Sequence, residues 1–368
     1  MGHEKKVKPS VFTFPSGMYA SNFWRLTFPT YQLNILDEIS FSTSMNYLKD
    51  ASIFRGVDVV WLQRATGFEH VKYIQSLAQL REKFGFRIIH DVDDVLIRED
   101  MPDFFSIKRN ENFFNGEAMK VIFSLCDEIT VTTPFLKEYY LSKFGHNNIT
   151  VIPNRIPYFW AGGYYNEEIR LNNYRKHKMR PRILFAGSPI HINGFKIPGN
   201  DDFTHIIEAI KSSIHEFRWI FLGGIPHELK DQCLKGEVEY HQMESIATYH
   251  PKLLTLEGCI MVAPLSEHIH NHGRSNCKFQ EASAQGLPIV CQDITPYKMC
   301  PIRFTTGDQM LHQIRETLET EESYINAIRL GKKLLDEMWL ELDENIGMYK
   351  ELFSSSYQDK DRKYLCTI

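Results

Sequence analysis

The sequence lacks any long apolar run. No stretch approaches the roughly 20 consecutive apolar residues that a helix needs to span a bilayer, and the segment Met1 to Ser10 is polar, without a signal-peptide core. Cysteine is scarce as well, with seven scattered residues and none at the short paired spacing of a zinc site or redox motif. We therefore expect a cytoplasmic protein without stable membrane insertion, whose thiols are reduced.

A large charge excess, internal repeats and low-complexity segments are absent too. The formal net charge is only −4, which gives no overall reason to expect a nucleic-acid partner, although a local patch can still provide one. Hydrophobic residues make up 43% and charged residues 24%, the usual mixture of a globular protein. At 368 residues the chain is too long for one ordinary core, so we expect two domains of roughly 150 to 180 residues each.

Short apolar runs alternate with longer segments of helical periodicity. The strand candidates are Val11 to Phe14, Val57 to Leu62, Phe86 to His90, Glu128 to Thr132, Ile149 to Ile152, Ile183 to Ala186, Trp219 to Leu222, Cys259 to Ala263 and Ile289 to Cys291. The helix candidates between them are Glu69 to Phe84, Pro134 to Phe144, Phe203 to Phe217 and Asn276 to Gln285, with Asp308 to Thr320, Glu321 to Leu340 and Glu344 to Phe353 near the C-terminus. This alternation is typical of parallel sheets and predicts an α/β fold with two doubly wound domains.

The alternation lapses between Pro153 and Arg182, in an aromatic, glycine-containing and then strongly basic stretch. We therefore expect an N-terminal domain over residues 1–155, a basic linker over 156–181 and a C-terminal domain over 182–340. Residues 341–368 form a helix and a polar tail, which are candidates to return to the N-terminal domain.

The most informative cluster lies about three-quarters of the way along the chain. Asn276 is placed to cap a helix. Lys278 and Glu281 lie three residues apart on one face of that helix. Gly286 ends it before a buried strand. A helix that begins beside a strand end attracts anions, and Lys278 and Arg274 add charge for a phosphate. Glu281 can accept hydrogen bonds from ribose hydroxyls, so the cluster indicates a nucleotide-sugar site.

Two strand-end loops are further candidates for donor binding. Gly17 follows the first strand and permits close approach of the backbone to a ligand, and Ser188 follows the first strand of the second domain. An ordinary turn is an equally good interpretation of each loop. No G-x-G-x-x-G follows the first strand, which argues against a standard dinucleotide-binding fold.

The run His90-Asp91-Val92-Asp93-Asp94 directly follows a strand. Strand ends border the cleft of α/β domains, so His90, Asp93 and Asp94 are candidate catalytic residues that contact the donor sugar or the acceptor. A carboxylate pair can also bind a divalent ion with a diphosphate, or one carboxylate can act as a base. An Asp-rich helix cap beside a buried histidine is the alternative.

Three alternating histidines, His268, His270 and His272, would face one way in an extended segment. A zinc site is disfavoured because no fourth ligand is evident, and we expect a polar loop over the nucleotide instead.

A basic run lies in the expected linker. Its six cations come within thirteen residues and no acid lies among them: Arg170, Arg175, Lys176, Lys178, Arg180 and Arg182. Such a run can follow a phosphate backbone, which makes Arg175, Lys176 and Lys178, together with Arg25, candidate acceptor-binding residues if the acceptor is DNA. A solvated linker face is the alternative.

These motifs together resemble the GT-B glycosyltransferases, in particular the large retaining family that includes sucrose synthase and the bacterial mannosyltransferases. The pattern Lys278-x-x-Glu281-x-x-Ala284-x-Gly286-x-Pro288-Ile289-Val290 is similar to the nucleotide-sugar signature of that family. Ile220 to Gly224 is similar to its strand and glycine turn, and Val151-Ile152-Pro153-Asn154 to its interdomain junction. The resemblance implies two Rossmann-like domains facing across a cleft. It also implies sugar transfer with retention of configuration, with neither metal nor cofactor.

One position departs from that family. A second Glu usually stands eight positions before the one matched by Glu281, where this chain has Gly273. In the family that Glu lies near the donor sugar, so the resemblance leaves Asn271, His272 and Arg274 as substitutes here.

A narrower similarity concerns the acceptor. Phe14-Pro15-Ser16-Gly17, Trp24-Arg25-Leu26 and Ile89 to Asp94 resemble glycosyltransferases of large tailed phages, some of which modify hydroxymethylated cytosines in DNA. The similarity implies transfer from a UDP-linked donor, such as glucose or arabinose, to 5-hydroxymethylcytosine in the host cytoplasm. A glycosyltransferase of surface-glycan or lipopolysaccharide assembly, a non-catalytic nucleotide-sugar-binding protein and a sugar-nucleotide epimerase stay open as alternatives.

Overall fold

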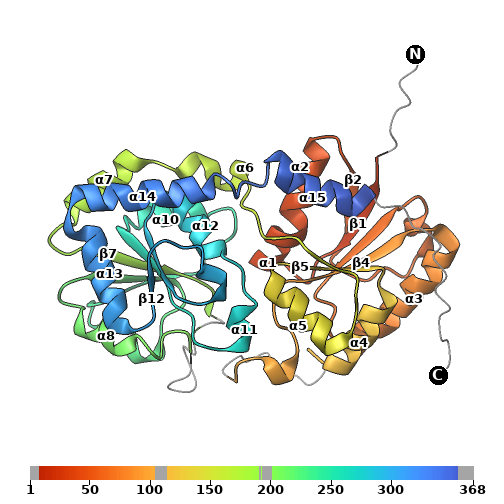
Figure 1. Ribbon diagram of the computed structural model, residues 1–368, viewed down its shortest axis with the longest axis horizontal. Helices are drawn as coiled ribbons and strands as arrows, with labels where there is room; N and C mark the ends of the chain where they lie inside the picture. The colour runs from red at the N-terminus through yellow and green to blue at the C-terminus, as the bar shows by residue number, and fades with distance from the viewer. Residues whose placement is uncertain (1–7, 104–113, 190–191, 193–200, 355–368) are drawn as a thin grey trace, which may run out of the picture.

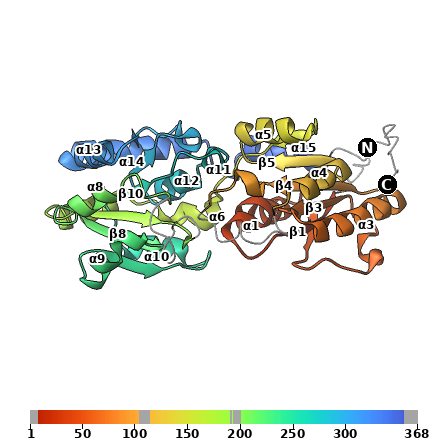
Figure 2. The same ribbon diagram turned by 90° about the horizontal axis from the view of Figure 1, so that it is seen from below.

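Two separate parallel sheets organise the chain in the computed structural model, which describes residues 8–103, 114–189, 192 and 201–354. The first six-stranded sheet has the strand order β2-β1-β3-β4-β5-β6, and the second has the order β12-β11-β10-β7-β8-β9. The two domains lie end to end along the longest axis of the molecule (Figures 1 and 2). The predicted α/β class with two doubly wound domains is confirmed.

The N-terminal sheet is built from buried central strands. Its strands are β1 (Ser10–Phe14), β2 (Ser40–Thr43), β3 (Val59–Gln63), β4 (Arg87–Val92), β5 (Glu128–Val131) and β6 (Ile149–Val151). Its helices are α1 (Ala20–Asn22), α2 (Phe28–Ile35), α3 (Phe68–Phe84), α4 (Gly116–Leu125) and α5 (Pro134–Phe144), with a π-helical turn η1 (Phe23–Thr27) and short turns η2 (Ala51–Phe54) and η3 (Arg98–Asp100). β3 and β4 are buried along their whole length, as expected of parallel strands that helices cover on both faces.

The C-terminal sheet has the same layered plan. Its strands are β7 (Arg182–Ala186), β8 (Arg218–Gly223), β9 (Glu239–Gln242), β10 (Ile260–Ala263), β11 (Ile289–Gln292) and β12 (Arg303–Phe304). Its helices are α8 (Ile207–Ser212), α9 (Lys230–Leu234), α10 (Tyr249–Thr255), α11 (Ile269–His272), α12 (Cys277–Ala284), α13 (Gly307–Glu319) and α14 (Glu321–Leu335), with short turns η7 (His227–Leu229) and η8 (Thr295–Tyr297). No helix in the described part of the chain has the length and apolar character needed to cross a membrane.

The segment between the sheets, predicted to be a basic linker, contains three short helical elements. It forms α6 (Tyr158–Ala161), η5 (Gly162–Tyr164) and α7 (Glu167–Lys176). α7 packs on α14, where the rings of Tyr174 and Tyr324 stack with centroids 4.8 Å apart. The basic stretch therefore belongs to the helical surface of the C-terminal domain (Figure 1).

The last described helix, α15 (Asp343–Ser354), lies on the N-terminal domain (Figure 1). Its Phe353 ring packs on Trp61 of β3 with centroids 5.3 Å apart, inside an apolar cluster that also holds Tyr349. The chain thus crosses twice between the domains. The two crossings are hydrogen-bonded, since the Leu340 N–H donates to the carbonyl oxygen of Ile156 over 2.9 Å.

Candidate functional site

Lys278 and Glu281 lie three residues apart on α12, beside the carboxyl edge of the C-terminal sheet. The Lys278 Nζ atom donates a hydrogen bond to the carbonyl oxygen of Ala186, the last residue of β7, and lies 4.9 Å from the centre of the Phe185 ring. Burial lowers the pKa of Lys278, whereas the carboxylate of Glu281 opposes that shift. A cation therefore stands at the end of β7, where open α/β sheets bind their ligands.

Two glycines bring the loops after β7 and β8 against this cation. A Cβ atom on Gly187 would lie 2.6 Å from Lys278 Nζ, and one on Gly223 would lie 2.3 Å from the carbonyl oxygen of Gly187. Gly223 also has a φ of +99°, which residues with a side chain adopt only with strain. The backbone of Ala186 and Gly187 therefore lies against the ammonium group, with the half-buried Ser188 next along the loop, as in sites where amide groups approach an anion closely.

The Glu281 carboxylate is held by a residue of a neighbouring helix. The Tyr249 hydroxyl, at the start of α10, donates a hydrogen bond to Glu281 Oε2 over 2.9 Å. Burial raises the pKa of Glu281, and Lys278 and the Tyr249 hydrogen bond both oppose the rise. The other lone pairs of an ionised carboxylate can accept hydrogen bonds from hydroxyl groups. No local pattern in the sequence marks Tyr249 for this role.

The predicted capping role of Asn276 is wrong. Asn276 occupies the N-cap position of α12, but with φ −84° and ψ 29° its side chain makes no capping hydrogen bond. Its Oδ1 atom instead accepts a hydrogen bond from Gln280 Nε2 over 2.8 Å. The side chain that was expected to satisfy the first amides of α12 is thus engaged elsewhere.

Arg274 lies just before α12, close to a buried carboxylate that the sequence did not reveal. Asp202 Oδ1 accepts hydrogen bonds from the Ser266 N–H over 3.0 Å and from Asn271 Nδ2 over 2.8 Å. Burial raises the pKa of Asp202, and the charge of Arg274 is the largest influence that opposes the rise. Asp202 therefore anchors the loop after β10 and balances part of the positive charge beside α12.

Asp93 and Asp94 lie at the carboxyl edge of the N-terminal sheet, where Arg64 joins them. Arg64 Nε lies 2.5 Å from Asp93 Oδ1, and Arg64 Nη2 lies 2.6 Å from Asp94 Oδ2. Arg64 has a left-handed backbone with φ 50° and directly follows β3, so its side chain reaches back over the end of β4. The two predicted carboxylates are therefore a cluster with one arginine, at the edge of the sheet that open α/β folds use for ligands.

Gly17 lies at the same edge of the N-terminal sheet. It follows β1, and the preceding Ser16 donates hydrogen bonds through its N–H and its hydroxyl to Gln63 Oε1, at 3.3 and 3.2 Å. Gln63 ends β3, next to Arg64. The loop of Gly17 is thus tied to the strand that carries the arginine of the carboxylate cluster.

The predicted catalytic role of His90 is wrong. Its side chain has no exposed surface, and its Nε2 atom accepts a hydrogen bond from the Ala65 N–H over 3.0 Å. Burial lowers the pKa of His90 to about 3, so the imidazole is neutral at physiological pH. His90 contributes to the core beneath the cluster, as the alternative interpretation of the sequence had it.

Arg25 is likewise not an acceptor-binding residue. Its guanidinium is fully buried and pairs with Asp91, with Nη2 lying 2.7 Å from Asp91 Oδ1. A side chain without exposed surface cannot contact a nucleic-acid backbone. The sequence gave no signal for Asp91 as the partner of Arg25.

Two of the three candidate cations in the basic run are paired with acids that lie far away in the sequence. Arg175 forms a bidentate ion pair with Glu321, in which Nε and Nη2 lie 2.8 and 2.7 Å from the two carboxylate oxygens. Lys176 Nζ lies 2.7 Å from Glu257 Oε1. Lys178 is exposed. α7 also lies on the outer side of the C-terminal domain, away from the other domain (Figure 1). Binding of DNA by this run remains a prediction, with its charge largely balanced within the protein.

The histidine segment forms a helical turn, α11, rather than an extended loop. His270 is buried with its Nδ1 atom 3.0 Å from the carbonyl oxygen of Val95 in the other domain, while His272 Nε2 lies 2.6 Å from Glu267. The three rings therefore do not share one face. Within the described residues, no three His, Cys, Asp or Glu side chains gather where they could hold a metal ion.

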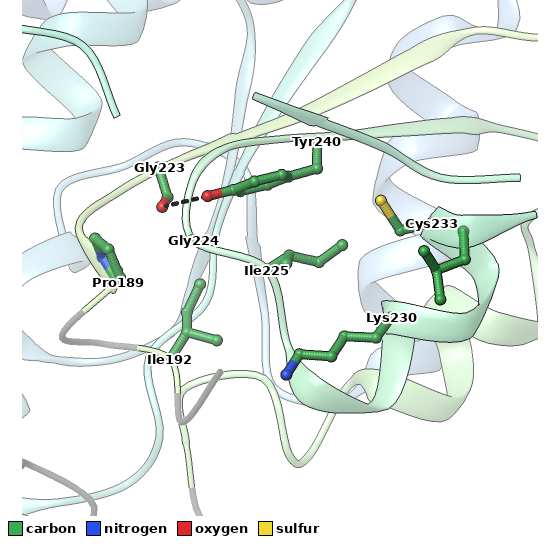
Figure 3. Close-up of a pocket in the computed structure, with 9 residues that line it drawn as sticks. Pro189, Ile192, Gly223, Gly224, Ile225, Lys230, Cys233 and Tyr240 are labelled. Carbon is green, nitrogen blue, oxygen red and sulfur yellow. Dashed lines mark hydrogen bonds between the residues drawn. The ribbon is translucent and has the colours of Figure 1, made fainter. Parts of the chain in front are cut away.

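An apolar cavity of 280 Å³ adjoins the glycine loops (Figure 3). Tyr240 lies on one side of it, with its hydroxyl 3.5 Å from the carbonyl oxygen of Gly223, and Lys230 lies on the other. The residues lining it are Pro189, Ile192, Gly223, Gly224, Ile225, Lys230, Cys233, Leu234 and Tyr240. The cavity is next to the Lys278 site because Gly223, which lines it, contacts the backbone of Gly187, and Gly187 adjoins Lys278.

A larger cavity of 590 Å³ lies between Pro102 and Asp103 of the N-terminal domain and loops of the C-terminal domain. Carboxylates from four places in the chain line it: Asp103, Asp201, Glu267 and Asp293. Two histidines, but no lysine or arginine, are among the described residues of its wall. The wall suits hydroxyl-bearing groups better than phosphates.

No protein-family model and no curated protein matches the sequence. Solved structures do match it over nearly the whole chain. HepE (Alr3699) from Anabaena, in complex with UDP and glucose, is 10% identical with a TM-score of 0.64, over 95% of this chain and all of HepE. An alpha-glucosyltransferase in complex with UDP and a 13-mer DNA containing an HMU base is 11% identical with a TM-score of 0.58, over 94% of this chain and 99% of that chain.

A third match is TarM from S. aureus, in complex with alpha-GlcNAc-glycerol and UDP. It is 12% identical with a TM-score of 0.54, over 89% of this chain and 58% of TarM. At such low identities these likenesses establish the fold. The chain has the GT-B fold, as the resemblance of its motifs implied.

Proposed function

We propose that the protein is a hexosyl- or pentosyltransferase that moves a sugar from a UDP-linked donor to an acceptor hydroxyl with retention of configuration. The observation that carries the proposal is the site at the start of α12, where Lys278 lies against the glycine loop that follows β7 and Glu281 lies one helical turn away. Structures with the same fold hold UDP or UDP-glucose, which supports a uridine nucleotide as the ligand.

The charges assign the roles of the site residues. Negative charge grows on the departing diphosphate in the transition state, and Lys278, Arg274 and the amides beside Ser188 stabilise it there. Glu281 accepts hydrogen bonds from the ribose hydroxyls. Asp93 and Asp94 contact the sugar or the acceptor hydroxyl from the N-terminal domain. The chemistry requires no metal ion, because the cations of the protein take the place of one.

The apolar cavity beside Gly223 is the place that we assign to the nucleobase. Ligand sites are mostly apolar with a few polar groups that fix orientation, and this cavity combines aliphatic walls with the Tyr240 ring. A diphosphate at Lys278 and a base in the cavity lie on either side of the same glycine loop.

Two kinds of acceptor are candidates. A modified base in DNA is supported by the matched alpha-glucosyltransferase, whose structure contains UDP and DNA with an HMU base. A carbohydrate acceptor is favoured by the carboxylate-lined cavity between the domains, because carboxylates repel phosphodiesters and accept hydrogen bonds from hydroxyls.

A transfer assay tests the function and separates the acceptors. The protein is incubated with radiolabelled nucleotide sugars, including UDP-glucose and UDP-arabinose, and with hydroxymethylcytosine DNA, unmodified DNA or glycans in parallel. Label in hydroxymethylcytosine DNA alone establishes the DNA acceptor, and label in glycans alone establishes the carbohydrate acceptor. UDP binding without transfer would contradict catalysis and leave a binding protein, while donor conversion without any acceptor would indicate an epimerase.

Replacing Tyr249 with phenylalanine is expected to change the pH dependence of UDP binding. Binding by Glu281 requires its ionised form, so affinity falls as the pH drops through the raised pKa of this carboxyl. The Tyr249 hydrogen bond lowers that pKa, and its removal moves the loss of affinity to higher pH. Calorimetric titration with UDP between pH 5 and pH 8 measures the shift.

Tyr324→Phe is the matched control. Its hydroxyl also donates over 2.9 Å, but to the carbonyl oxygen of Cys259, and its ring is buried in a cluster with Tyr174 and Ile328 that contains no residue of α12. The pH profile of this variant is expected to match that of the wild type. Identical profiles for Tyr249→Phe and the wild type would contradict the role given to Glu281.

A further inference from the structure

Arg25 lies in a buried network that the proposed chemistry does not use. One side of its guanidinium pairs with Asp91, with Nε 3.1 Å from both carboxylate oxygens. The other side donates from Nη1 to the carbonyl oxygen of Ile152 over 2.5 Å and to Asn154 Oδ1 over 3.1 Å. Arginine presents five donors in a rigid fork, so a single side chain serves the end of β4 and the crossing between the domains at once.

Asn154 carries the network into the C-terminal domain. While its Oδ1 atom accepts from Arg25, its Nδ2 atom donates to Ser275 Oγ over 2.8 Å and to Cys277 Sγ over 3.3 Å. A guanidinium can only donate, so the amide of Asn154 has one favourable orientation. Ser275 and Cys277 flank the start of α12. One side chain therefore joins the N-terminal sheet to the first turn of the donor-site helix.

Gln280, further along α12, joins the same crossing. Its Nε2 atom donates to the carbonyl oxygen of Asn154 over 2.9 Å, and its Oε1 atom accepts from the Ile156 N–H over 2.9 Å. The side chain is fully buried. The helical turn that carries Lys278 is thus tied on both sides, at Cys277 and at Gln280, to the segment that connects the domains.

A buried ion pair is weak evidence of a contribution to stability. Burying a guanidinium costs free energy that a buried ion pair offsets only in part, and apolar side chains often replace such pairs without loss. Arg25 also lies in the π-helical turn η1, a geometry that is rare and frequent at functional sites. We infer that Arg25 is a positioning residue, which acts through Asn154 to fix α12, and with it Lys278, relative to the N-terminal sheet. The inference rests on the proposed function, because α12 is the helix assigned to donor binding.

Arg25→Lys tests the inference with little change in charge. A lysine keeps a cation beside Asp91, but its single nitrogen atom cannot take the place of the separate guanidinium nitrogens that donate to Asp91 and to Asn154. Thr130→Val is the matched control, because it removes a buried hydrogen bond of 2.7 Å to the same Asp91 carboxylate and leaves Asn154 untouched. Two quantities are measured: the dissociation constant for UDP by calorimetry, and the amide hydrogen exchange of residues 277–284 without ligand. The thermal midpoint of each variant is recorded as well.

Arg25→Lys is expected to weaken UDP binding by about tenfold and to speed the exchange of α12 amides, because the helix loses its link to the N-terminal sheet. Thr130→Val should change each quantity less than twofold at a similar thermal midpoint. If both variants lose affinity and protection equally, or neither does, Arg25 has a purely structural role and the inference fails. Asn154→Ala replaces Arg25→Lys if the latter does not fold. A wild type that binds no UDP would refute the proposed function, while the exchange comparison still decides the positioning role.

Discussion

Replacement of Lys278 with alanine is expected to reduce kcat/KM for sugar transfer by about 100- to 1,000-fold, the usual effect of removing one charge-stabilising group from a transition state. The Lys278 ammonium lies at the end of β7 against the backbone of Ala186 and Gly187, where the departing diphosphate gathers charge. Transfer of radiolabel under conditions of limiting donor measures the loss. The dissociation constant of UDP is expected to rise too, because UDP carries the same diphosphate.

The fold of this variant should stay intact. Burial lowers the pKa of Lys278, which means that the folded protein gains little from the charge of this side chain. Lys211→Ala serves as control, since Lys211 forms an exposed ion pair with Glu208 on α8 of the same domain. Transfer rates of Lys278→Ala within threefold of the wild type would remove the basis of the proposed function.

Gly223→Ala is expected to abolish measurable UDP binding. The new Cβ atom would lie 2.3 Å from the carbonyl oxygen of Gly187, so the loop after β7 must move away from Lys278. The backbone of Gly223, with φ +99°, adds a strain of about 1 to 2 kcal/mol for a residue with a side chain. Calorimetric titration with UDP and urea unfolding measure the two effects separately.

Gly236→Ala is the control that separates the effect of backbone strain from the effect of a steric clash between loops. Gly236 has a similar φ of +74°, but a Cβ atom there would meet nothing within 4 Å. Both variants should lose stability, whereas only Gly223→Ala should lose UDP. Wild-type affinity in Gly223→Ala would show that the loops after β7 and β8 do not form the phosphate site.

Several central strands of the two sheets were predictable because each contains an unbroken apolar run. Val59–Gln63 and Arg218–Gly223, for example, are covered by helices on both faces, and burial of that kind leaves a continuous apolar run in the sequence. The strands that the sequence did not reveal, β2, β9 and β12, lie at sheet edges. β2 reads Ser-Phe-Ser-Thr and is largely exposed, so its pairing with β1 rather than its composition makes it a strand.

The residues of the candidate site likewise fall into those that the sequence predicted and those that it did not. Lys278 and Glu281 were predictable because one helix carries both at a spacing that brings them together. Tyr249, Asp202 and Arg64 were not, because their partners lie 32, 69 and 29 residues away in the sequence. Burial explains the errors at His90 and Arg25. His90 lies within β4 and Arg25 within η1, and the exposure of each side chain depends on elements that pack there from elsewhere in the chain.

The return of α15 to the N-terminal domain has a consequence for biosynthesis. Ile346, Tyr349, Leu352 and Phe353 complete the apolar cluster beneath β1, β3 and β4, which are made more than 250 residues earlier. During translation the C-terminal domain is finished first, while the first domain to leave the ribosome still exposes the surface that α15 will cover. The amino-terminal half must therefore wait for the last described helix before it reaches its final stability, and its apolar surface is open to chaperones until then.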